Sequence, residues 1–177
     1  MIWACFCNNK LSPIAFFKGS VNADVYIDVL STIFLLFVDA ISGDEITNII
    51  FQQNNASSYT AKKTREFLES TGRNYGFTIM EWPPISLDIN PIENLWAHLK
   101  PQLHISYLDT RHLSGSPDAI KAELTKRLTE VWWTIGEEVL NALVESMPAR
   151  VEALIAKAAD CAPSPPAGRY TVSSLPF

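Results

Sequence analysis

The chain has 177 residues, of which 47% are hydrophobic, and its formal net charge at pH 7 is −5. This length and apolar content suit one globular domain with a substantial core. The acidic balance argues against a chain whose main task is to grip nucleic acid, because neutralising phosphates requires clustered lysine and arginine side chains.

Three cysteines, Cys5, Cys7 and Cys161, form no recognisable metal or disulfide framework. We expect free thiols in a reducing compartment and an intracellular protein, nuclear or cytoplasmic, because no secretory signal is visible. The apolar run 29–38 is flanked by acidic residues and is too short to span a bilayer. It therefore predicts a buried helix rather than a membrane segment.

The first part of the chain predicts a hairpin, a helix and a strand. Short apolar runs at 2–6 and 13–17 are separated by a turn signal at 8–10, which favours a β-hairpin. A helix is expected over about 23–37. Residues 47–52 are rich in β-branched side chains and predict a buried strand.

The next segment predicts an α/β crossover. Residues 61–70 have the pattern of an amphipathic helix, with Gly72 as the expected C-cap, and residues 77–81 predict a further strand. This strand–helix–strand order implies parallel strands joined by a right-handed connection. Polar residues that follow the two strands are then expected at one edge of the sheet, where α/β folds place their sites.

A helix with a defined start follows at Asn90, a good N-cap, and Pro91, which suits the first helical position. Apolar residues then recur at i, i+3, i+4 and i+7: Ile92, Leu95, Trp96 and Leu99. Pro101 is expected to end or kink this helix, and residues 102–115 to form a loop.

The C-terminal part predicts a helical extension over 116–160. Ser116 and Pro117 open a long helix, Gly136 breaks it, and a last helix is expected to bend at Pro148. Residues 161–177 are rich in Pro, Ser and Gly and predict a loose tail.

Glu93 has two interpretations. Asn90-x-x-Glu93 is close to a capping box, in which the glutamate only satisfies the backbone N–H of the N-cap. Alternatively, a carboxylate fixed on the first turn of a helix beside a strand end suits a metal-dependent phosphoryl-transfer site. The two roles are compatible, and spacing alone favours capping.

Three stretches resemble one protein family. Residues 82–96, WPPISLDINPIENLW, are similar to the WPP-x-SPDLNPIENLW signature of the Tc/mariner superfamily of DDE transposases. Residues 51–61, FQQNNASSYTA, resemble the family motif FQQDNAPxHTA, and residues 146–151, SMPARV, are similar to a segment SMPRR near the end of such domains. The likeness runs from about Ile2 to Ala158.

The resemblance implies an α/β fold of the RNase H-like type, with a mixed sheet flanked by helices. Residues 1–160 would form a truncated catalytic domain of this kind. The family's first, central strand would precede the strand at 2–6, and the sequence begins at Met1. Without that strand, two apolar strands either expose unpaired backbone groups or close up across the gap.

The resemblance also implies chemistry. In a DDE site three carboxylates hold two Mg²⁺ or Mn²⁺ ions that promote DNA strand cleavage and transfer. Glu93 matches the third acid, whereas Asn54 stands where the family has the second aspartate, and Tyr59 where it has histidine. Asn55 cannot substitute for position 54, since a shift of one residue at a strand end points to the other face.

The first acid has no counterpart, since no acidic residue precedes Asp24. The other early acids are expected at helix ends or in solvated loops: Asp24, Asp28, Asp39 and Asp44. Three histidines lack metal-ligand spacing and are expected in surface or capping roles: His98, His104 and His112. Trp132 and Trp133 favour core packing over an interface. Basic residues on two helices favour a solvated face over phosphate contacts: Lys62, Lys63, Arg65, Lys121, Lys126 and Arg127.

We therefore expect a degenerate catalytic domain that binds DNA weakly and does not bind Mg²⁺ or Mn²⁺ productively. Whether the chain is an enzyme stays open, because the family is an endonuclease and two of its three acids are missing here. The alternatives are a non-catalytic binding or homo-oligomerisation module, a decayed gene product, or a reading frame that omits an upstream exon with a helix-turn-helix region and the first aspartate. No membrane partner is expected.

Overall fold

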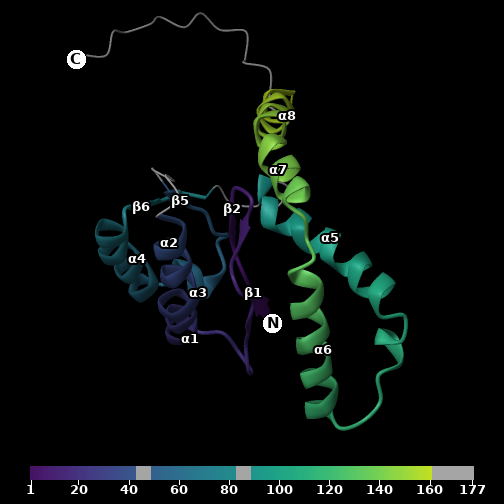
Figure 1. The fold of residues 1–177 in the computed structure, drawn as a ribbon. Coiled ribbons are helices and arrows are strands. Elements are labelled where there is room, and N and C mark those ends of the chain that lie inside the picture. The colour runs from purple at the N-terminus through teal and green to yellow at the C-terminus, as the bar shows by residue number, and fades with distance from the viewer. Residues whose placement is uncertain (43–48, 83–88, 161–177) are drawn as a thin grey trace, which may run out of the picture.

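The computed structural model describes residues 1–42, 49–82 and 89–160 of the chain. A β-hairpin lies at the centre, with one group of helices and a two-stranded parallel sheet on one side and the C-terminal helices on the other (Figure 1). This mixed arrangement confirms the predicted α/β class.

The hairpin forms where it was predicted, in two short antiparallel pairs. β1 (Ile2–Trp3) pairs with β4 (Ala15–Phe16), and β2 (Phe6–Cys7) pairs with β3 (Lys10–Leu11). Ser12 joins the two pairs, because its N–H donates to the Cys5 carbonyl and its Oγ accepts from the Cys5 N–H, each at 2.9 Å. Asn8 turns the chain with a positive φ of 50°, a conformation that asparagine tolerates.

One continuous helix follows, composed of α1 (Ala23–Val29), the π-helical segment η1 (Leu30–Phe34) and α2 (Leu35–Ser42). It begins where Asn22 Oδ1 accepts from the Val25 N–H at 2.9 Å. The whole helix has 20 residues and a mean hydropathy of 1.9, and by length and composition alone it could cross a membrane, whereas the expectation rested on the shorter run 29–38. Its buried face packs in the core, which supports the predicted core helix: Tyr26, Leu30, Phe34, Val38 and Ile41.

The predicted crossover is confirmed. β5 (Ile49–Phe51) runs parallel to β6 (Phe77–Ile79), and α3 (Ser57–Thr60) and α4 (Lys62–Tyr75) lie between them in the chain. The expected C-cap was wrong, because α4 continues past Gly72 and ends at Gly76 with φ 72°. A Cβ at Gly72 would lie 2.8 Å from the Phe77 carbonyl oxygen, so glycine is needed there for close packing instead.

The strands form three two-stranded sheets, and among the described strands none joins the hairpin to the β5–β6 pair. Ile50 of β5 remains 57% exposed. Side chains of the β1–β4 pair and of the β5–β6 pair nevertheless share one core cluster, which includes Trp3 and Phe51.

The C-terminal extension contains α5 (Pro91–Ser106), the 3-10 segment η3 (Thr110–His112), α6 (Pro117–Trp132), α7 (Glu137–Glu145) and α8 (Met147–Asp160). Pro101 was predicted to end or kink this helix, and it does not end it, because α5 continues to Ser106 and buries Leu103 in the second core cluster. That packing offsets the backbone hydrogen bond that proline cannot make. The chain breaks near Gly136 and before Pro148 as predicted, although two separate helices result.

The two neighbouring tryptophans have different environments. Trp132 is fully buried and stacks on Trp96 with a ring-centroid distance of 5.2 Å, whereas Trp133 is 54% exposed. The Trp132 indole N–H also donates to the Ser12 carbonyl at 2.8 Å, which connects α6 to the hairpin. Core packing was therefore the right prediction for Trp132 only.

Arg127 corrects another prediction, because it is buried rather than part of a solvated helix face. Its guanidinium donates two hydrogen bonds to Asp109, at 2.7 and 3.1 Å, and one to Glu123 at 2.7 Å. It also lies 4.7 Å from the centre of the Tyr107 ring. Arg127 thus fastens the α5–α6 connection and is not available to a phosphate.

Candidate active site

The segment that follows β5 is held by Tyr26, a side chain of the core helix that α1, η1 and α2 form. The Tyr26 hydroxyl donates to Gln53 Oε1 at 2.8 Å, and Gln53 Nε2 donates to the Tyr59 carbonyl at 3.4 Å. The Tyr26 and Tyr59 rings stack with their centroids 4.0 Å apart. The residues after the strand are therefore fixed against α1 and α3.

The start of α5 is connected to the same segment. Asn90 is buried, and its backbone occupies the N-cap position, but its side chain makes no capping hydrogen bond. Asn90 Oδ1 instead accepts from Gln52 Nε2 at 3.3 Å. This contact joins the two sequence motifs beyond the carboxyl end of β5, at the edge where the site was predicted.

Glu93 lies on the first turn of α5 and is half-buried. Within the described residues no hydrogen bond between its carboxylate and the Asn90 N–H closes a capping box. Burial raises the pKa of the Tyr59 hydroxyl, and the negative charge of Glu93 raises it further. The charge of Glu93 thus acts on a residue of the second motif.

Asn54 and Asn55 differ in what they contact. Asn54 is half-buried, and its Oδ1 accepts from the Ala56 N–H at 3.1 Å, which stabilises the turn before α3. Asn55 is exposed, and its Nδ2 donates to the Trp82 carbonyl at 3.0 Å. The amide oxygen at position 54 is therefore already a backbone hydrogen-bond acceptor.

The described residues do not fit a two-metal centre. No group of three or more His, Cys, Asp or Glu side chains that could hold a metal ion occurs within 1–42, 49–82 and 89–160. The exposed side chains of Asp24, Asp28 and Asp39 lie on the core helix, where Asp24 pairs with Lys63, and Asp44 lies outside the described residues. One glutamate and a neutral amide remain of the predicted site.

The other candidates stay apart from these residues. His98 of α5 lines a shallow cavity of about 440 Å³ between α5, α7 and α8, together with Glu138. His104 lies in the last turn of α5, and His112 lies in η3. Cys5 and Cys7 are free thiols on the hairpin, and burial raises the pKa of Cys5 to about 12. Cys161 lies outside the described residues.

Sequence reasoning missed the residues that hold the site together. Tyr26 stood in an apolar helix pattern and gave no sign of its contacts with Gln53 and Tyr59. Gln52 belonged to a recognised motif, but its pairing with Asn90 connects residues far apart in the chain. The adjacent glutamines after a strand were the available signal, since long amides there can bridge to neighbouring elements.

Comparison with known proteins gives the family. A sequence profile described as DDE superfamily endonuclease matches residues 1–113. The chain belongs to this family. It is 27% identical to the Tcb2 transposase of Caenorhabditis briggsae over 155 residues, which cover 88% of this chain and 50% of that protein. It is 28% identical to the Tc3 transposase of Caenorhabditis elegans over 88% of this chain and 43% of that protein. The DDE domain thus spans about half the length of the curated relatives it matches.

Solved structures support the fold. The chain superposes on the catalytic domain of the Mos1 mariner transposase with a TM-score of 0.66 and 19% identity, covering 88% of this chain and 72% of that one. A second Mos1 catalytic domain, solved with raltegravir and Mg, gives the same TM-score and covers 73% of that chain. The protein is a Tc/mariner DDE transposase catalytic domain with an RNase H-like fold, as its motifs predicted.

Proposed function

We propose that this DDE domain does not cleave DNA. The observation that supports the proposal is the side chain at position 54, an amide whose oxygen accepts from the Ala56 N–H. Metal-dependent strand cleavage requires carboxylates that hold two divalent ions in place. Glu93 supplies one carboxylate, and Asn54 supplies no charge.

The energetic consequence is large. A unit negative charge 4 Å from a unit positive charge contributes about 4 kcal/mol at an effective dielectric constant of 20. Replacing the second aspartate by asparagine removes this attraction, which is about twice as large for a divalent ion. Mg²⁺ or Mn²⁺ held by Glu93 alone would remain weakly bound, so Glu93 and Asn54 are remnants of a catalytic site in this proposal.

The direct test is a nicking assay on supercoiled plasmid with Mg²⁺ or Mn²⁺, using the protein and its Glu93→Ala variant. The proposal predicts the same background for both proteins. Turnover that Glu93→Ala abolishes would contradict it. Asn54→Asp alone should also stay inactive, because among the described residues only Glu93 and position 54 would then supply carboxylates to the site. A gain of cleavage in that variant would show that the acids have been misassigned.

We propose that this chain binds DNA, as its family membership suggests, and that the binding is weak because the net charge of the chain is −5. We also propose a nuclear or cytoplasmic location. Fluorescence anisotropy with duplex DNA at increasing salt tests the binding proposal. We expect a shallow salt dependence, since few cations are available to displace counterions.

A second candidate function is a non-catalytic oligomerisation module. Its support is α8, which extends away from the rest of the fold (Figure 1) and exposes Val151, Leu154 and Ile155 by 40%, 38% and 64%. Size-exclusion chromatography with light scattering distinguishes the candidates. A discrete dimer would favour the module, whereas a polydisperse aggregate would favour a decayed gene product.

A further inference from the structure

A groove of about 1060 Å³ lies along β6 and α4, and its end next to the candidate site is lined by Gln53, Asn55 and Tyr59 of the second motif. One wall consists of the consecutive residues 76–82, and the other consists of α4 side chains that include Arg65, Glu69 and Arg73. Side chains alternate between the two faces of a strand. A wall made of consecutive strand residues therefore indicates that the groove runs along the strand's edge.

The backbone of β6 confirms which edge is open. The Met80 N–H donates to the Phe51 carbonyl of β5 at 2.9 Å. Because backbone groups in a strand alternate in direction, the N–H and C=O of Phe77, Ile79 and Glu81 turn away from β5. The α4 backbone at Gly72 approaches the Phe77 carbonyl closely, so within the described residues the open hydrogen-bonding positions of this edge lie at Ile79 and Glu81.

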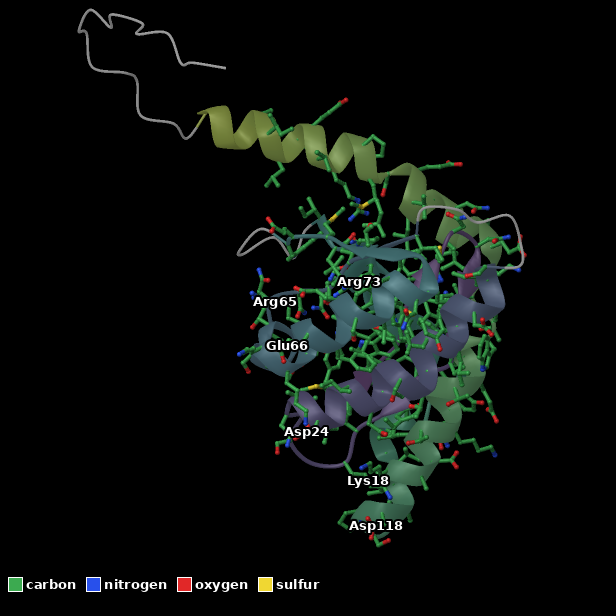
Figure 2. All side chains as sticks on the ribbon, turned by 90° about the vertical axis from the view of Figure 1, so that its left-hand side faces the viewer. Lys18, Asp24, Arg65, Glu66, Arg73 and Asp118 are labelled. Carbon is green, nitrogen blue, oxygen red and sulfur yellow. The ribbon has the colours of Figure 1, made fainter. Side chains whose placement is uncertain are left out.

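The opposite wall carries a row of alternating charge. Arg65, Glu69 and Arg73 are exposed and recur every four residues along α4, which places them about 6 Å apart along the helix axis. Figure 2 shows Arg65 and Arg73 along α4, and both line the groove. The Arg73 Nε–H donates to the Glu69 carbonyl at 3.1 Å, which holds this guanidinium along the helix. Glu66 pairs with Lys62 instead, at 3.7 Å, and does not line the groove.

The spacing of this row matches an extended chain. In a strand, residues i, i+2 and i+4 share one face and lie about 6.6 Å apart in successive steps. An added strand with an acidic, a basic and an acidic residue at these positions would meet Arg65, Glu69 and Arg73 in turn. Its backbone would at the same time pair with the open edge at Ile79 and Glu81, a known mode of peptide recognition.

We propose that the groove binds an extended peptide segment of a partner protein, added beside β6, with the pattern acidic–x–basic–x–acidic facing α4. A single-stranded nucleic acid fits the groove less well. Glu69 and Glu81 line it together with the two arginines, and their carboxylates would repel a polyphosphate backbone. The same carboxylates suit a peptide of mixed charge.

The test uses two labelled peptides of the same length that contain the same three residue types. They are Thr-Glu-Thr-Lys-Thr-Glu-Thr and its charge-reversed form Thr-Lys-Thr-Glu-Thr-Lys-Thr, both acetylated and amidated. We expect the first peptide to bind at least tenfold more tightly in fluorescence anisotropy. Since the protein is net acidic, non-specific attraction would favour the reversed peptide. Equal binding, or a preference for the reversed peptide, would overturn the proposal.

A charge-swapped variant provides the matched control. The triple substitution Arg65→Glu, Glu69→Lys and Arg73→Glu changes exposed side chains only, and its fold can be checked by circular dichroism. The preference between the two peptides should invert in this variant, and an unchanged preference would overturn the assigned groove.

Two further measurements test the backbone pairing and the class of ligand. N-methylation of alternate peptide amides should weaken binding at least tenfold in one register and leave it unchanged in the other, because only one set of amides faces β6. Equal effects in both registers would contradict strand addition. An oligothymidylate that displaces the peptide and loses affinity in the triple variant would assign the groove to nucleic acid instead.

Discussion

The contact between Trp132 and Ser12 offers a quantitative test of how the C-terminal helices are joined to the hairpin. Trp132 is fully buried, and its indole N–H donates to the Ser12 carbonyl at 2.8 Å. In Trp132→Phe this buried carbonyl loses its partner, which costs about 1–3 kcal/mol. The smaller ring also leaves space beside Trp96, so we expect a total loss of about 2–4 kcal/mol.

The assay is urea unfolding followed by circular dichroism at 222 nm, and the matched control is Trp133→Phe. Trp133 is 54% exposed, so the same substitution there should change the free energy of unfolding by no more than about 0.5 kcal/mol. Similar losses in both variants would refute the reasoning. A second, lower transition in Trp132→Phe would show that α6 and the hairpin then unfold separately.

Three further predictions concern charge, packing and thiol reactivity. Arg127 donates hydrogen bonds that lower the pKa of Asp109. The pair therefore stabilises the fold fully above the ordinary carboxyl pKa, and its contribution is lost as the pH falls through the lowered value. Thermal unfolding between pH 2 and 6 should show a weaker pH dependence in Asp109→Asn, and an unchanged pH dependence would contradict the pairing. Gly72→Ala should destabilise by about 1–3 kcal/mol in urea unfolding, because its Cβ would lie 2.8 Å from a carbonyl oxygen of β6, whereas the exposed Ser70→Ala on the same helix should change little. With a pKa of about 12, Cys5 should resist iodoacetamide at pH 8 until urea unfolds the chain, as measured by mass spectrometry of the labelled peptides. Rapid labelling in the folded protein would contradict the raised pKa.

Local signals in the sequence were sufficient for several elements. The turn at Asn8, the start of α5 at Pro91 and the N-cap at Ser116 were predicted because each depends on residues within one turn of the chain. The parallel pairing of β5 with β6 followed from element order alone.

The errors came from packing between distant residues. Pro101 was expected to end or kink α5, but Leu103 is buried against the C-terminal helices and the helix continues past the proline. A glycine after an amphipathic segment is typical of a helix C-cap, and only the position of β6 shows why Gly72 lies inside α4. Trp132 and Trp133 are adjacent residues of the same type, so the sequence offered no reason to treat them differently. In the structure Trp132 is buried and contacts Ser12, whereas Trp133 is exposed.

The candidate site was predicted by resemblance more than by spacing. Spacing alone favoured a capping role for Glu93, and the family motif indicated its position in the acidic triad. The sequence could not show that Gln52 pairs with Asn90 or that the charge of Glu93 acts on Tyr59. Both contacts depend on how the two motifs meet beyond the end of β5.

The most direct test of the central claim is a Mn²⁺ titration of the folded protein, with free Mn²⁺ measured by electron paramagnetic resonance. One carboxylate and an amide cannot hold a pair of divalent ions in this account, so the protein and its Glu93→Gln variant should give the same weak, millimolar-range binding. Two Mn²⁺ ions bound per chain at micromolar concentrations, and lost in Glu93→Gln, would contradict it.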